Sequence, residues 1–106
     1  MYLDYPHIMK YILFYKGPAT LPVTSHKGWP TWFNKLGNAL IDIGSPLANG
    51  IAMHSDGSTT NSDSAATLNG YSIIQAKDKN EVLELIKDHP YLALGKEYTI
   101  EIFEKK

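Results

Sequence analysis

Residues 8–15, IMKYILFY, constrain the fold most, because their apolar side chains alternate onto two faces. Successive side chains of a strand point to opposite faces of a sheet, so Tyr11 and Leu13 share one face and Ile12 and Phe14 share the other. A strand that is apolar on both faces is covered on both sides. The segment therefore predicts a central strand with packing above and below it.

A strand, a helix and a last strand are predicted in the second half of the chain. Residues 71–76 are rich in β-branched and aromatic side chains, which favour a strand. Asp78 lies three residues before Glu81, a spacing that is typical of a capping box at the start of a helix. Pro90 lacks an N–H group and is expected to end this helix. A final strand is predicted over residues 98–103.

Between the strand over residues 8–15 and the strand over residues 71–76, the sequence predicts a helix and a short strand. The helix is expected over residues 30–43, ended by Gly44, and the strand over residues 51–54. Residues 16–28 are expected to form a long loop. Residues 55–68 are polar, and their Asp-Gly pair marks a hairpin turn. The apolar stripe of the helix consists of Trp29, Phe33, Leu36, Leu40 and Ile43.

The predicted element order is β-α-β-β-α-β, the ferredoxin-like arrangement of the α+β class. Two helices would cover one face of an antiparallel sheet whose first and third strands are central. The other face stays open, and burying apolar surface stabilises an interface by roughly 25 cal/mol per Å². We therefore expect a homodimer with the two sheets facing each other. In the alternative, the loops over 16–28 and 55–68 cover this face of a monomer.

The length of 106 residues suits one domain with one modest core. Residues 1–8 are interpreted as an N-terminal extension and residues 9–106 as a single domain, with Met9 as an alternative start. The chain shows no signal peptide and no apolar run of the roughly 20 residues that a membrane helix needs, so a cytoplasmic location is expected.

Composition excludes several classes of function. The net charge of −1 offers no basic surface for nucleic acid. The lack of cysteine excludes disulfides, thiolate catalysis, cysteine-bound zinc and iron–sulfur clusters. The histidines match no metal-ligand spacing, so no metal site is predicted. No phosphate-binding glycine motif occurs, and no tightly held cofactor is expected.

Two His–Asp pairs are candidate acid–base groups. His54 and Asp56 are two residues apart, so they would share one face of a strand. Asp88 and His89 are adjacent at the predicted end of the second helix. A histidine titrates near neutrality and a carboxylate can orient it. The alternatives are a surface pair for the first and a histidine that satisfies terminal carbonyls for the second.

A cleft between helix and sheet is the expected ligand site. Trp29 or Trp32 would supply a flat apolar wall, and Tyr71 would point a hydroxyl group into the cleft. His26, in the long loop before the helix, is a further candidate ligand contact that could act as a general acid or base. The alternative is a solvated loop residue.

Several segments resemble the YCII-related family, also called the DGPF-domain group. They are MKYILFY (9–15), WFNKLGNALIDIGSPLANG (32–50), NGYSIIQAKDKNEVLELIKDHPYL (69–92) and YTIEIFE (98–104). The resemblance implies a ferredoxin-like fold paired as a dimeric α/β barrel, and a His–Asp pair in a cleft of some members.

The expected cleft and the resemblance to the YCII-related family together predict that the protein binds a small, partly apolar molecule in a dimeric α/β barrel. The alternative is a small cofactor-independent enzyme in which a His–Asp pair transfers a proton.

Overall fold

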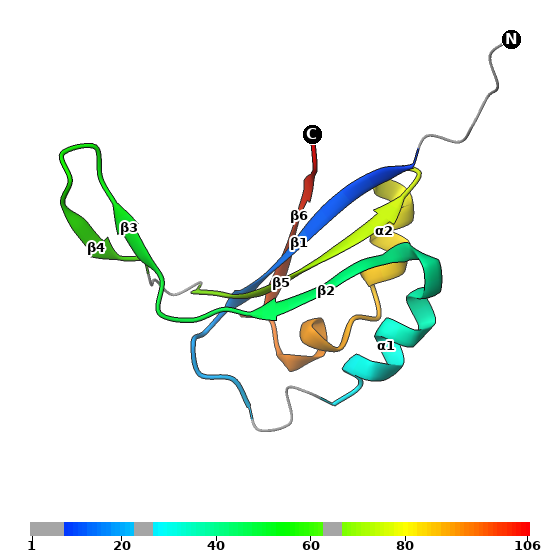
Figure 1. Ribbon diagram of the computed structural model, residues 1–106. Helices are drawn as coiled ribbons and strands as arrows, with labels where there is room; N and C mark the ends of the chain where they lie inside the picture. The colour runs from blue at the N-terminus through cyan, green and yellow to red at the C-terminus, as the bar shows by residue number, and fades with distance from the viewer. Residues whose placement is uncertain (1–7, 23–26, 63–66) are drawn as a thin grey trace, which may run out of the picture.

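The computed structural model describes residues 8–22, 27–62 and 67–106. Two α-helices, two short 3-10 helices and six strands follow one another along this part of the chain (Figure 1). They are β1 (Met9–Gly17), α1 (Trp29–Leu36), η1 (Gly37–Ala39), β2 (Leu40–Pro46), β3 (Ile51–Met53), β4 (Thr59–Asn61), β5 (Thr67–Ala76), α2 (Lys79–Ile86), η2 (Pro90–Leu94) and β6 (Thr99–Glu104).

The main sheet has four strands in the order β2-β5-β1-β6. Every neighbouring pair in it is antiparallel. Both α-helices lie against the same face of this sheet (Figure 1). The predicted α+β class, with an antiparallel sheet and two helices, is therefore confirmed.

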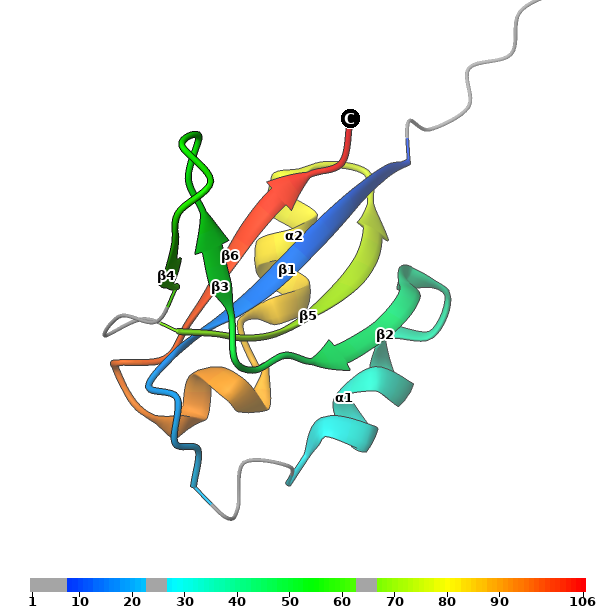
Figure 2. The same ribbon diagram turned by 60° about the vertical axis from the view of Figure 1, so that its left-hand side comes forward.

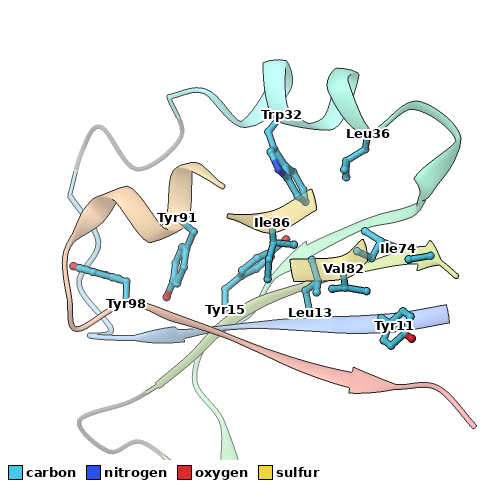
Figure 3. Packing of buried hydrophobic residues seen from close by; sticks show 11 residues of the cluster. Tyr11, Leu13, Tyr15, Trp32, Leu36, Ile74, Val82, Ile86, Tyr91 and Tyr98 are labelled. Carbon is cyan, nitrogen blue, oxygen red and sulfur yellow. The ribbon is translucent and has the colours of Figure 1, made fainter. Parts of the chain in front are cut away.

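The core lies between the helices and one face of β1 and β5 (Figure 3). Tyr11, Leu13 and Tyr15 of β1 are buried, as the alternation of the sequence predicts. Trp32 of α1 and Val82 of α2 pack onto them from above. Burying one large apolar side chain stabilises a fold by about 1.5–3 kcal/mol.

Helix α2 begins with the predicted cap. The Asp78 carboxylate accepts a hydrogen bond from the backbone N–H of Glu81 at 2.9 Å. The Glu81 carboxylate reaches back and accepts from the N–H of Lys77 at 2.9 Å. The helix ends at Ile86, earlier than expected, and Pro90 instead opens the 3-10 helix η2, where its missing N–H costs nothing.

The helix predicted over residues 30–43 is wrong in its second half. Helix α1 ends at Leu36, and Gly37 turns the chain with a φ of 55°, which glycine adopts at little cost. Leu40 and Ile43 belong to the edge strand β2. Apolar residues that recur every three or four positions are compatible with a helix, but the glycine inside this pattern ends the helix.

The predicted strand over residues 51–54 does not join the main sheet. Among the described strands it forms β3 and pairs with β4 alone in a separate hairpin, while β2 supplies the second strand of the main sheet. The hairpin turn at Asp56 and Gly57 is confirmed by the β3–β4 pairing around it. The hairpin projects from the body of the protein, and Ile51 and Met53 are 70% and 75% exposed on it (Figure 2).

The face of the main sheet opposite the helices carries apolar side chains. Ile12 and Phe14 of β1 are half-buried there, and the ring of Phe14 lies 5.6 Å from that of Phe103, which is exposed. The expected N-terminal extension lies outside the described residues, apart from the exposed Ile8. No helix in the described part of the chain has the length and apolar character to span a membrane.

Candidate functional site

A pocket of about 260 Å³ opens on the helix-covered side of the sheet. It lies where the start of α1, the end of β1, strand β2 and the helix η2 meet. Most of its wall is apolar. The apolar side chains of this wall are Leu21, Trp29, Phe33, Ile43 and Pro46.

Ring contacts fix the aromatic wall of the pocket. The Trp29 ring lies 5.0 Å from the Tyr15 ring at an interplanar angle of 79° and 5.7 Å from the Phe33 ring. It also meets the His89 ring edge-to-face at 4.6 Å. Edge-to-face pairs of this kind contribute about 0.5–1.5 kcal/mol beyond the area that they bury. The indole is therefore held as a rigid wall.

A close approach of two strands shapes the pocket on the β2 side. Gly44 has a φ of 82°, and a Cβ atom there would overlap the carbonyl oxygen of Tyr71. One residue earlier, the Ile43 carbonyl oxygen accepts a hydrogen bond of 2.6 Å from the Ser72 hydroxyl group. Only glycine allows β2 to come this close to β5 at this point.

A buried chain of hydrogen bonds runs behind the aromatic wall. The backbone N–H of Tyr91 donates to His89 Nδ1 at 2.9 Å, so this nitrogen carries no proton. In the neutral ring the proton is then on Nε2, which donates to the Tyr15 hydroxyl oxygen at 3.2 Å. The Tyr15 hydroxyl group in turn donates to Ser72 Oγ at 2.7 Å.

This arrangement holds His89 neutral. The side chain is 1% exposed, and burial lowers its pKa from 6.5 to about 3. Burial also raises the pKa of Tyr15 to about 12, although the hydrogen bond to Ser72 opposes the shift. Both nitrogens of His89 are already paired, so the ring has no free lone pair to take a proton from a ligand near neutrality.

The two predicted His–Asp pairs are not joined by hydrogen bonds between their members. Asp88 lies on the surface and pairs with Lys35 at 3.2 Å, whereas His89 points into the core. His54 lies next to the hairpin turn, where its Nε2 is 3.0 Å from Thr60 Oγ1.

The carboxylate of Asp56 is occupied within the hairpin turn. It accepts hydrogen bonds from the hydroxyl and the backbone N–H of Ser58 at 2.6 and 2.9 Å, and these bonds lower its pKa. His54 and Asp56 are both exposed, and neither lines the pocket.

The residues expected to bind a ligand are divided between the pocket and the core. Trp29 and Tyr71 line the pocket. Trp32 is buried instead, and its indole N–H donates to the Leu85 carbonyl oxygen at 3.2 Å. It lies on the side of α1 that faces α2. His26 lies outside the described residues.

Four polar residues that line the pocket were missed by the sequence analysis: Tyr15, Ser45, Asn69 and Tyr91. Tyr15 was expected only as part of the first strand, and no role was predicted for Asn69. Tyr91 follows the proline that was taken as a helix stop, and no local pattern distinguishes it. Pairing of β1 with β5 brings the ends of these strands together, which only the fold reveals.

The described residues include no group of three or more histidine, aspartate or glutamate side chains that could hold a metal ion. Around the pocket, rigid aromatic rings enclose an apolar space with hydroxyl and amide groups at its edge. Such a space can bind a small ring compound. Comparison with known proteins found no matching family model and no matching curated protein.

Proposed function

We propose that the protein binds a small, partly apolar molecule in the pocket beside Trp29. The observation that carries this proposal is a preformed space of about 260 Å³ with a fixed aromatic wall. An apolar cavity of about 150 Å³ is large enough to hold benzene. Pockets for drug-sized ligands are about 300–1,000 Å³, so the ligand expected here has one or two rings.

Binding is favoured over the alternative of acid–base catalysis by a His–Asp pair. The His89 ring contacts the rings of Trp29 and Tyr15, which line the pocket, and its ring nitrogens are paired with Tyr91 and Tyr15. The carboxylate beside it in sequence, that of Asp88, pairs with Lys35 on the surface. A general base needs a free nitrogen within reach of the proton that it removes.

We further propose that the chain is a ferredoxin-like, YCII-related domain that pairs as a dimeric α/β barrel. The order of its main strands and the segments quoted above support the family proposal. The homodimer would form through the open sheet face, because Ile12, Phe14 and Phe103 lie there with part of their apolar surface exposed.

Sedimentation velocity of two aspartate variants tests the dimer. Phe14→Asp places a charge on the open face, and Leu83→Asp places the same charge on the exposed side of α2. We expect a dimer for the wild type and for Leu83→Asp, and a monomer for Phe14→Asp. A wild-type chain that sediments as a monomer at high concentration would contradict the dimer proposal.

Ligand binding is tested by NMR titration with toluene and indole. A matched pair of variants locates the site: Ile43→Trp fills the pocket mouth, and Leu83→Trp adds the same bulk on the outer side of α2. We expect saturable shifts of the Trp29 and Phe33 signals in the wild type and in Leu83→Trp, and their loss in Ile43→Trp. Equal shifts in all three proteins would refute the pocket as the site.

A further inference from the structure

Two of the polar residues that line the pocket, Asn69 and Tyr91, are hydrogen-bonded to each other, and we call this pair the polar edge of the pocket. Asn69 Nδ2 donates one hydrogen to the Pro18 carbonyl oxygen at 3.0 Å and the other to the Tyr91 hydroxyl oxygen at 3.1 Å. These bonds fix the orientation of the amide, because only its nitrogen can donate to a carbonyl group. Asn69 and Tyr91 both line the pocket.

One donor and one acceptor remain on this pair. A tyrosine hydroxyl group that accepts a hydrogen bond still has its own hydrogen to donate, and an amide oxygen has two lone pairs. Within the described part of the chain, no group accepts the hydrogen of Tyr91 and none donates to Asn69 Oδ1. A donor and an acceptor therefore lie side by side at the pocket edge.

The pocket lining offers no charged partner. Its described side chains include no carboxylate, ammonium or imidazole group. Burial raises the pKa of both Tyr15 and Tyr91, so these hydroxyl groups stay neutral. Burying a charge without a partner of opposite sign is strongly unfavourable, whereas a neutral polar group is accepted if it is hydrogen-bonded.

We infer that the pocket selects an uncharged aromatic molecule carrying a carboxamide-like group, whose carbonyl oxygen accepts from Tyr91 and whose N–H donates to Asn69. This inference rests on the proposed function, because it assigns a ligand class to the same pocket. The ring would lie against Trp29 and Phe33, and the amide would reach the polar edge. A ligand with both a carbonyl and an N–H group can form a hydrogen bond with each of Tyr91 and Asn69, whereas a hydrocarbon can form neither bond.

The test compares three probes of similar size: benzamide, benzoate and toluene. Their dissociation constants are measured by NMR titration against the full-length wild-type chain. A net contribution of about 0.5–1.5 kcal/mol per hydrogen bond corresponds to a preference of about 2- to 10-fold for each bond formed. Benzamide forms two such bonds and is therefore expected to bind about 4- to 100-fold more tightly than toluene. Benzoate is expected to bind more weakly than both.

Two tyrosine variants identify the group responsible. Tyr91→Phe removes the donor and is expected to lower the benzamide-to-toluene preference by about 2- to 10-fold. Tyr98→Phe makes the same chemical change in the ring that packs at 5.5 Å against Tyr91 but does not line the pocket. It is expected to leave the preference unchanged.

The outcomes separate this inference from the proposed function. If toluene binds but benzamide binds no more tightly, or if benzoate binds as well as benzamide, the ligand class is wrong and the pocket proposal stands. An unchanged preference in Tyr91→Phe also overturns the assignment of the donor. If none of the three probes binds, the proposed function fails together with the inference.

Discussion

The Tyr15 hydroxyl oxygen and His89 Nε2 lie 3.2 Å apart in the core, although 74 residues separate them in sequence. The contact joins the end of β1 to the segment that follows α2. It continues through Ser72 to the backbone of β2. One chain of hydrogen bonds behind the aromatic wall of the pocket therefore links four parts of the fold: the segment after α2 and the strands β1, β5 and β2.

Stability is predicted to fall on acidification because of His89. In the folded protein its pKa is lowered to about 3, whereas the unfolded chain has the ordinary value of 6.5. At a pH between these two pKa values, His89 is protonated in the unfolded state but not in the folded state. Acidification in this window favours unfolding by at most about 1.4 kcal/mol per pH unit. Urea unfolding at pH 7, 6 and 5 measures this slope.

A pair of glutamine variants isolates the contribution of His89. His89→Gln should be less stable at pH 7 but should show a shallower slope than the wild type. His54→Gln makes the same replacement on the exposed hairpin and serves as the control for the substitution itself. NMR provides a direct check: a His89 ring that protonates near pH 6 in the folded protein would contradict the prediction.

Removal of the Tyr15 hydroxyl group is predicted to destabilise the protein by about 1–3 kcal/mol. Tyr15→Phe leaves His89 Nε2 without an acceptor in a buried site and removes the donor to Ser72. Tyr98→Phe is the control, because the described residues form no hydrogen bond with the Tyr98 hydroxyl group. Thermal unfolding compares the two variants, and an equal loss in both would show that the chain of hydrogen bonds contributes nothing specific.

Two glycines with similar backbone angles are predicted to respond differently to alanine. Gly44 and Gly57 have φ values of 82° and 87°. A Cβ atom at Gly44 would overlap the carbonyl oxygen of Tyr71, whereas at Gly57 it meets nothing within 4 Å. Gly57→Ala should cost about 1–2 kcal/mol from strain alone. Gly44→Ala should cost more than about 4 kcal/mol, since β2 must separate from β5. Urea unfolding measures both, and equal costs would contradict the close approach.

The cap of α2 is predicted to contribute about 1 kcal/mol. Asp78→Ala removes the acceptor for the N–H of Glu81 at the start of the helix. Lys79→Ala changes the next residue, which is exposed, and should have little effect. Chemical denaturation measures the free energy of unfolding of both variants. An Asp78→Ala variant as stable as the wild type would show that Glu81 alone suffices to begin the helix.

The sequence predicted α2 well because two independent local signals agreed there: a capping box at Asp78 and Glu81, and a proline beyond the helix. The first helix was overextended because Leu40 and Ile43 continue its spacing, although the chain turns at Gly37 and pairs with β5. Long-range strand pairing decides the secondary structure of such a segment, and the local spacing of apolar residues carries no information about that pairing.

The candidate site was only partly predictable for the same reason. Trp29 and Tyr71 were expected in a cleft, and both line the pocket. Residue type drew attention to His89, but its role depends on Tyr15 and Tyr91, which folding brings beside it. Sequence spacing within one element could not reveal a chain of hydrogen bonds that passes through η2, β1, β5 and β2.

The most direct test of the proposed function is the location of bound toluene by intermolecular nuclear Overhauser effects. The pocket is one apolar surface available to it, and the exposed Ile51 and Met53 of the hairpin are another. We predict effects between the toluene methyl group and the ring protons of Trp29 and Phe33. Effects confined to Ile51 and Met53, with none at Trp29, would contradict the proposal that this pocket is the ligand site.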